Sequence, residues 1–172
     1  IYMNEDSRYF NSQLAMQSAT KAANAGDLYG MNSIGYLYDH GLGVKEDNDI
    51  AMKWFRKAAD QGLPLAQNNV AVIYHEDSYK GYDAKQALKW YEKSANNGYL
   101  EAQLTLADYF RTGCYDGFDQ NAKKSEYWYK KAAEQNSSEA QFRLGDFYLY
   151  GFNEIQVNDV LAQKYLLQAA EQ

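Results

Sequence analysis

The sequence of 172 residues contains one cysteine, one proline and two histidines, and its formal net charge at pH 7 is −6. Because Cys114 is the single cysteine, an intrachain disulfide is excluded. The scarcity of proline permits long helices, since proline removes a donor and clashes inside a helix. No stretch approaches the roughly 18 apolar residues of a membrane helix, so no direct membrane insertion is expected. The acidic balance argues against nucleic acid as a partner, because such proteins need a basic face.

The composition is that of a folded protein. Apolar residues make up 46% and charged residues 23% of the sequence, which is globular and not disordered. A length of 172 residues corresponds to one domain, so we expect a single domain over 1–172. The chain begins with Ile1 rather than methionine, and we expect either a trimmed start or a fragment of a longer chain.

A pair of small residues recurs along the chain at intervals of 36, 36, 38 and 37 residues. A tryptophan or tyrosine precedes most of these pairs by four positions, and a glycine or asparagine follows most of them. Such a fixed period is typical of a repeat architecture, in which each repeat is one supersecondary unit. The five pairs are Ala22-Ala23, Ala58-Ala59, Ser94-Ala95, Ala132-Ala133 and Ala169-Ala170.

Each period contains two amphipathic segments. Small, apolar and aromatic residues stand at offsets 0, 4, 5 and 8 of the first segment and at offsets 0, 3, 7 and 8 of the second. Both sets fall on one face of a helix. Gly62, Gly98 and Asn136 stand where a helix ends in a left-handed residue. Asp49 and Asp159 are the expected N-caps of two of the second helices.

The pattern predicts an all-α fold, an α-solenoid in which antiparallel helix pairs form a right-handed superhelix. The expected first helices are at about 28–40, 64–76, 100–112 and 138–150. The expected second helices are at about 8–25, 49–61, 84–97, 121–135 and 159–172. The expected boundaries are a half repeat at 1–26 and full repeats at 27–62, 63–98, 99–136 and 137–172.

The first full repeat carries the pattern most completely. It reads Gly30-x-x-x-Ile34-Gly35-x-x-Tyr38, then Gly41-x-Gly43-Val44, then Ala51-x-x-Trp54-Phe55-x-Lys57-Ala58-Ala59. This pattern resembles the Sel1-like repeat, a relative of the tetratricopeptide repeat. The resemblance covers nearly the whole chain, as about four and a half repeats, although the connections of the later repeats depart from it.

The resemblance implies a non-enzymatic scaffold or adaptor that holds a peptide or a folded protein in a concave groove. Bacterial members resemble adaptors in signalling, cell-envelope assembly and host interaction. Two alternatives stay open, namely an immunity protein that neutralises a secreted antibacterial toxin and a spacer domain of a longer protein. The location is open between the bacterial cytoplasm and the periplasm or the outside of the cell, and so is the oligomeric state. The single cysteine excludes the disulfide-rich secreted members.

No motif brings together the residues that catalysis needs. His40 and His75 have no second histidine at the i+4 spacing of a helical zinc site. The sequence contains neither a phosphate-binding loop nor a Gly-x-Ser-x-Gly elbow. Cys114 has no basic neighbour in the sequence that would activate it, and we interpret it as a loop thiol without a role. We therefore expect no enzyme activity, no metal and no cofactor.

A solenoid of this kind presents the first helix of each repeat on its concave face. Offsets 2, 6, 9 and 10 of these helices point away from the core, and several are apolar where an unpartnered helix carries Lys or Glu. Asparagine repeats at offset 2, where tetratricopeptide repeats hold a peptide backbone. The expected partner-binding residues are Asn32, Tyr36, Asp39, His40, Asn68, Val72, His75, Leu104, Asp108, Arg111, Phe142, Asp146 and Leu149.

The remaining aromatic residues divide into two groups. Those that recur in phase with the repeat are expected in the core, and those in connections are expected at the rim of the groove. The core group is Tyr38, Tyr74, Tyr148, Trp54, Trp90 and Trp128, and the rim group is Tyr82, Tyr99 and Tyr115.

Overall fold

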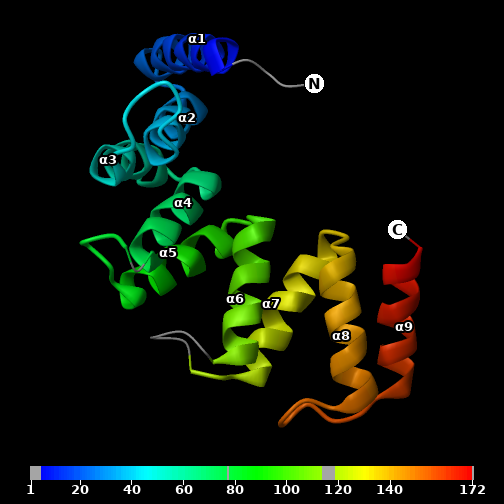
Figure 1. The fold of residues 1–172 in the computed structure, drawn as a ribbon. Coiled ribbons are helices and arrows are strands. Elements are labelled where there is room, and N and C mark those ends of the chain that lie inside the picture. The colour runs from blue at the N-terminus through cyan, green and yellow to red at the C-terminus, as the bar shows by residue number, and fades with distance from the viewer. Residues whose placement is uncertain (1–4, 77, 114–118, 172) are drawn as a thin grey trace. The chain divides into compact units, whose positions relative to one another are not determined.

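The computed structural model describes residues 5–76, 78–113 and 119–171. In these ranges helices follow one another with short connections (Figure 1). The helices are α1 (Glu5–Asn24), α2 (Leu28–Asp39), α3 (Asn48–Ala59), α4 (Pro64–His75), α5 (Ala84–Asn96), α6 (Leu100–Thr112), α7 (Ala122–Glu134), α8 (Ser138–Tyr150) and α9 (Asp159–Ala170).

The all-α repeat fold predicted from the sequence is confirmed. We call α2, α4, α6 and α8 the A helices and α1, α3, α5, α7 and α9 the B helices. Their ends lie within three residues of the expected ones. The A helix α2 packs on both of its neighbours in the chain, α1 and α3, and α8 packs in the same way on α7 and α9. Figure 1 shows α8 and α9 side by side and antiparallel.

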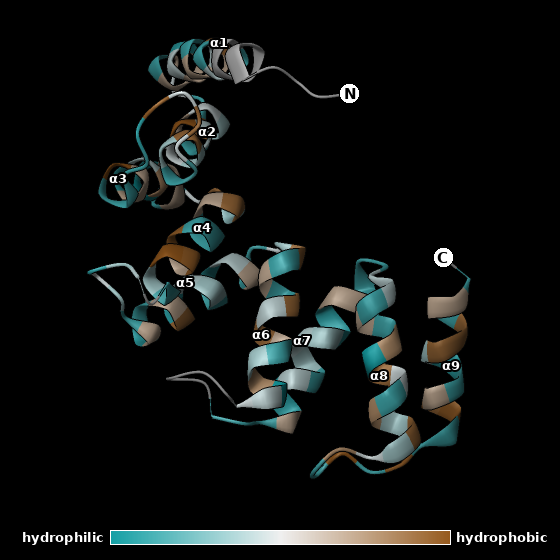
Figure 2. Ribbon diagram, viewed as in Figure 1, coloured by the Kyte–Doolittle hydropathy of each residue, from teal (hydrophilic) through white to brown (hydrophobic). Residues whose placement is uncertain are grey.

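The chain divides into two compact parts, an N-terminal half of residues 1–90 and a C-terminal half of residues 91–172. The right-handed superhelix and the single domain over 1–172 stay predictions. Apolar and polar residues alternate along the helices of both halves (Figure 2). Among the described helices, none is long and apolar enough to cross a membrane.

The helix ends explain where each repeat turns. Gly62, Gly98 and Asn136 have positive φ angles of 97°, 85° and 61°, which confirms the left-handed helix stops. The predicted N-caps, in contrast, are wrong. Asp47 caps α3, where its Oδ1 accepts a hydrogen bond of 2.9 Å from the amide of Ile50, and Asn158 caps α9 in the same way.

The carboxylates predicted as caps lie inside the first turn of their helices. Asp49 and Asp159 are the second and first residues of α3 and α9. A carboxylate there interacts favourably with the positive end of the helix dipole. An acidic residue is therefore favoured at both positions, and the sequence pattern does not separate the cap from the first turn.

The core lies where A and B helices meet. Trp90, Trp128 and Tyr148 are 8%, 6% and 5% exposed, which confirms their predicted place. In the N-terminal half the guanidinium carbon of Arg56 lies 4.8 Å from the centroid of the Trp90 ring. The other three aromatic residues expected in the core are half-buried, namely Trp54, Tyr38 and Tyr74.

Buried glutamines, which the sequence patterns did not reveal, fasten α4 and α6 to the preceding B helices. Gln67 donates from Nε2 to the Ala59 carbonyl over 3.1 Å, and Gln103 donates to the Ala95 carbonyl over 3.0 Å. Both carbonyls lie at the C-terminal end of a helix, where carbonyls lack intrahelical partners. Gln141 stands at the same position of α8 and is 3% exposed. The sequence feature that could have predicted these glutamines is their recurrence three residues after the start of α4, α6 and α8.

Trp90→Ala is expected to lower the free energy of unfolding by about 3–5 kcal/mol, because truncation of a buried tryptophan leaves a cavity. Urea unfolding followed by circular dichroism measures the change. The control is Tyr150→Ala, since Tyr150 is 77% exposed and its loss is expected to cost less than about 0.5 kcal/mol. Equal stability of the two variants would contradict the alignment of the repeats.

Gln67→Leu is expected to cost about 1 kcal/mol, because the side chain keeps its bulk but loses a buried hydrogen bond. The control is Gln61→Leu at an exposed position, where Nε2 donates to the carbonyl of Lys57 within the same helix end. The same unfolding measurement compares the two. A loss for Gln61→Leu as large as for Gln67→Leu would mean that the buried glutamine does not fasten the helices.

Candidate functional site

The A helices turn apolar side chains outward. Tyr36, Val72, Phe142 and Leu149 are 47%, 46%, 48% and 37% exposed. They come from α2, α4 and α8, at positions where the sequence predicted a partner-binding face. His40 is also exposed. The half-buried residues of the predicted set are Asp39, Asn68, His75, Leu104, Asp108, Arg111 and Asp146.

Asn32 is the exception. It is only 7% exposed, and its Oδ1 accepts a hydrogen bond of 2.9 Å from Nδ2 of Asn69 on α4. The expectation of an outward amide like that of Asn68 is therefore wrong for Asn32. The physical reason is its place at the border of the core face, where the next A helix covers it. Its amide ties α2 to α4 and lines the cavity described next.

A cavity of about 560 Å³ opens between α1 and α2. Small side chains of α1 leave this space, since Ala15, Ala19 and Ala22 form one wall. Tyr29 and Tyr36 from α2 stand on the other side, and both are exposed. The sequence analysis missed this cavity, although the run of small residues along α1 was a visible signal.

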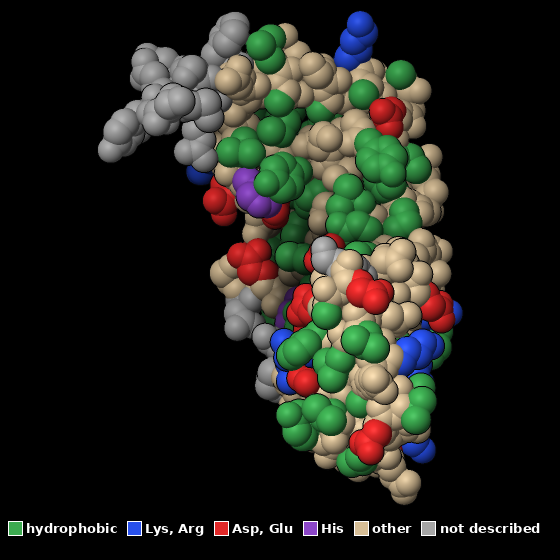
Figure 3. Space-filling view, turned by 90° about the vertical axis from the view of Figure 1, so that its right-hand side faces the viewer, with side chains coloured by type: hydrophobic (Ala, Val, Ile, Leu, Met, Phe, Trp, Pro, Cys, Tyr) green, Lys and Arg blue, Asp and Glu red, His purple; other side chains and the backbone are tan. Residues whose placement is uncertain are grey.

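The predicted residues at the C-terminal end of α2 form a stacked group. The rings of Tyr36 and His40 are 4.0 Å apart between centroids, with an angle of 25° between their planes. Nδ1 of His40 lies 3.1 Å from Oδ2 of Asp39. Figure 3 shows hydrophobic side chains in its upper part, with a histidine and acidic side chains beside them.

Asp39 lies in an acidic environment. Burial raises the pKa of its carboxyl above the usual value, His40 opposes this rise, and Glu76 and Glu46 add to it. Glu76 in turn accepts a hydrogen bond of 3.2 Å from Nδ2 of Asn48. Three carboxyl groups from α2 and from the segments that follow α2 and α4 therefore act on the same region.

In the C-terminal half, predicted residues of α6 bond to a buried tyrosine. Oδ1 of Asp108 accepts hydrogen bonds of 2.7 Å from the hydroxyl of Tyr129 and 2.9 Å from the Arg111 guanidinium. Tyr129 is 0% exposed, and burial together with Asp108 raises the pKa of its hydroxyl. The charge of Asp108 is thus compensated within the fold. The sequence analysis did not anticipate Tyr129, because a tyrosine on a core face looks like an apolar residue.

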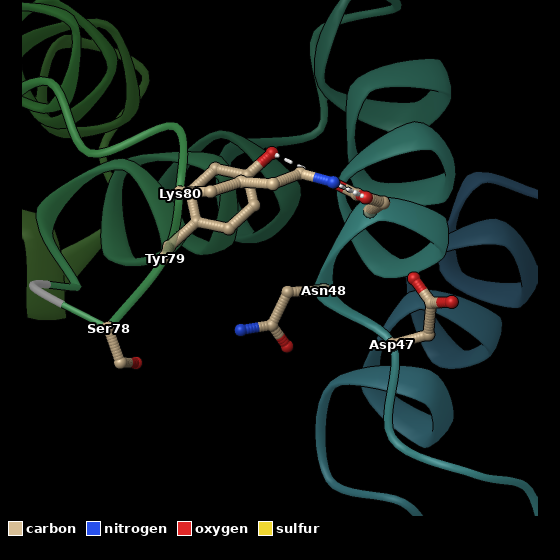
Figure 4. Close-up of a pocket in the computed structure, with 6 residues that line it drawn as sticks. Asp47, Asn48, Ser78, Tyr79 and Lys80 are labelled. Atoms are coloured by element: carbon tan, nitrogen blue, oxygen red, sulfur yellow. Dashed lines mark hydrogen bonds and ion pairs between the residues drawn. The ribbon is translucent and has the colours of Figure 1, made fainter.

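A polar cluster links the connection after α4 to the start of α3. Lys80 forms an ion pair with Asp49, and the hydroxyl of Tyr79 lies 3.4 Å from Oδ1 of Asp49. Figure 4 shows Tyr79 and Lys80 extending toward α3 beside a small cavity of about 230 Å³. The hydrogen bond and charge of Lys80 lower the pKa of Asp49. These bonds hold the connection in place.

Of the aromatic residues expected at the rim of the groove, the structure describes Tyr82 and Tyr99. Tyr82 is 37% exposed and stacks on His75 with 6.5 Å between ring centroids. Tyr99 is half-buried at the start of α6. Cys114 and Tyr115 lie outside the described residues. Within the described residues, no three His, Cys, Asp or Glu side chains gather as a metal site would require.

Comparison with protein families identifies the repeat. The sequence model of the Sel1 repeat matches residues 28–63, 64–99, 101–137 and 138–172. These ranges follow the A and B helix pairs of the four full repeats. No curated protein matches the chain.

Solved structures agree with this match. A Sel1 repeat protein from Oxalobacter formigenes is 30% identical, with a TM-score of 0.79, and the match covers 96% of this chain and 68% of that one. The protective antigen c5321 of uropathogenic Escherichia coli, with an SLR fold, is 30% identical, with a TM-score of 0.74. That match covers 91% of this chain but 33% of the antigen, so the chain spans about a third of the antigen's length.

More distant structures share the fold alone. The immunity protein Pa5087 from Pseudomonas aeruginosa is 16% identical, with a TM-score of 0.51, and the match covers 99% of this chain and 83% of that one. The family itself follows from the four matched repeats, which span most of the sequence. The chain belongs to the Sel1 repeat family.

Proposed function

We propose that the chain is a non-catalytic scaffold that binds a protein or peptide partner on the outward faces of its A helices. Sel1 repeats are typical of protein–protein interaction scaffolds without catalytic activity. The observation that carries the proposal for this chain is that A helices in both halves expose apolar side chains, on α2 and α4 in the N-terminal half and on α8 in the C-terminal half. Such side chains gain free energy when a partner covers them.

The proposed face offers two kinds of contact. Tyr36 and Phe142 are large and about half-exposed, so they supply apolar area that a partner side chain can cover. The half-buried polar residues Asn68 on α4 and Asp146 on α8 can pair with peptide groups. Apolar contacts would provide affinity, and the polar ones would select the partner.

The double variant Tyr36→Ala/Phe142→Ala is expected to lose partner binding with little change in melting temperature, because both side chains are about half-exposed. Wild type and variant serve as baits for bacterial lysate and culture supernatant, and mass spectrometry identifies bound proteins. The matched control is Leu14→Ala/Tyr127→Ala, which removes two side chains of similar exposure from the B helices α1 and α7.

The outcomes separate the roles. A protein lost only with the A-helix variant supports the proposal. Equal recovery by all three baits contradicts it and favours a spacer role. Unfolding of the A-helix variant, seen by circular dichroism, would mean that the two side chains belong to the core.

A second candidate within the binding class is a toxin-neutralising immunity protein. The net charge of −6 favours it, because an acidic inhibitor complements a basic toxin. The likeness to Pseudomonas aeruginosa immunity proteins, at 16% and 18% identity, concerns the fold alone. Affinity distinguishes the roles. A dedicated inhibitor binds one folded protein at about nanomolar Kd, whereas an adaptor binds a short segment at about micromolar Kd.

A further inference from the structure

We infer that the N-terminal half binds a segment that joins an apolar anchor to a basic side chain. The anchor enters the cavity between α1 and α2, and the Lys or Arg meets the carboxylates of Asp39, Glu46 and Glu76. The inference rests on the proposed function, because it names the chemistry of the partner on part of the same face.

The cavity has the character of a side-chain pocket. Its volume of about 560 Å³ exceeds what a single large side chain needs, and Ala15, Ala19 and Leu37 contribute apolar walls. Tyr29 and Tyr36 line it and are 63% and 47% exposed, so their rings are available to a partner. Aromatic residues beside a concave apolar site are frequent anchors of binding.

Tyr36 connects the pocket to the acidic region. It lines the cavity, and its ring stacks at 4.0 Å on that of His40, whose Nδ1 lies 3.1 Å from Asp39. From Tyr29 to Asp39 the helix rises about 15 Å, at roughly 1.5 Å per residue. An extended peptide covers this length with about four or five residues, at roughly 3.3 Å per residue.

The charges around Asp39 indicate that the bound segment carries a basic side chain next to its apolar anchor. The charges that act on Asp39 are those of His40, Glu76 and Glu46. The carboxylates of Glu76 and Glu46 therefore repel that of Asp39. The partial burial of Asp39 also weakens the solvation of its carboxylate. A bound Lys or Arg relieves both effects, whereas an acidic side chain makes them worse.

The test uses the full chain as the target of a phage-displayed library of random peptides of about twelve residues. Binders are expected to carry Lys or Arg within about five residues of a Phe, Tyr, Leu or Ile, because the rise of α2 from Tyr29 to Asp39 sets the largest separation. A fluorescent synthetic copy of the most enriched peptide then gives Kd by anisotropy.

Two double variants distinguish the effect on Kd of charge at the proposed site from the effect of the net charge of the protein. Asp39→Asn/Glu76→Gln is expected to raise Kd about tenfold at 50 mM salt and much less at 500 mM, because salt screens the lost attraction. Glu101→Gln/Glu139→Gln removes the same charge from the first turns of α6 and α8, and it is expected to leave Kd within about twofold. Tyr36→Ala is expected to weaken binding at both salt concentrations.

The results distinguish this inference from the proposed function. Binders without Lys or Arg that still require Tyr36 overturn the basic partner and leave the binding face in place. An unchanged Kd of the Asp39/Glu76 variant also overturns the basic partner. So does a control variant that loses as much affinity as the Asp39/Glu76 variant. Selection that yields no peptide sensitive to Tyr36→Ala overturns both the inference and the assignment of the face in this half.

Discussion

The close approach of paired helices is the constraint on which the rest of the structure depends. Gly30 of α2 lies so near α1 that a Cβ atom there would be 2.6 Å from the Cβ of Ala22 and 2.7 Å from the Ala23 amide nitrogen. Gly145 meets Leu166 of α9 in the same way, at 2.6 Å. At Gly30 such distances exclude a larger residue without displacement of the backbone, and at Gly145 the Leu166 side chain would have to move. Small residues at the helix contacts therefore define the repeat, and the large side chains fill the spaces around them.

Packing of this kind restricts the residue types on one face of each A helix and leaves the other face more variable. Offset 6 from the small residue illustrates the freedom, because it carries Tyr36, Val72, Asp108 and Asp146 in successive repeats. A core position could not accept tyrosine, valine and aspartate in turn, since buried polar groups need partners. The variation is possible because these positions are exposed or only half-buried, and it allows repeats of one fold to present different chemistry to a partner.

The sequence predicted the fold well because small residues, aromatic residues and helix stops recur with one period. Details that depend on a single neighbour were harder to predict. Asn32 lies between the core and outward faces, and only the position of Asn69 determines that it is buried. The choice of Asp47 over Asp49 as a cap depends on where the turn before α3 ends. Gln67 was overlooked because a polar residue on a helix is usually exposed, and its bond to Ala59 is a tertiary contact.

The two halves also differ in how much charge they leave for a partner. Asp108 in the C-terminal half accepts bonds from Arg111 and Tyr129, so its charge is compensated inside the fold. Asp39 in the N-terminal half has an imidazole beside it but also two further carboxyl groups acting on it. A compensated carboxylate holds its own helices together, whereas an uncompensated group of carboxylates attracts a cation. For this reason the presence of an acidic residue on a helix face does not by itself indicate a binding site for a cation. Whether that residue already has hydrogen-bond or ion-pair partners within the fold is the better guide.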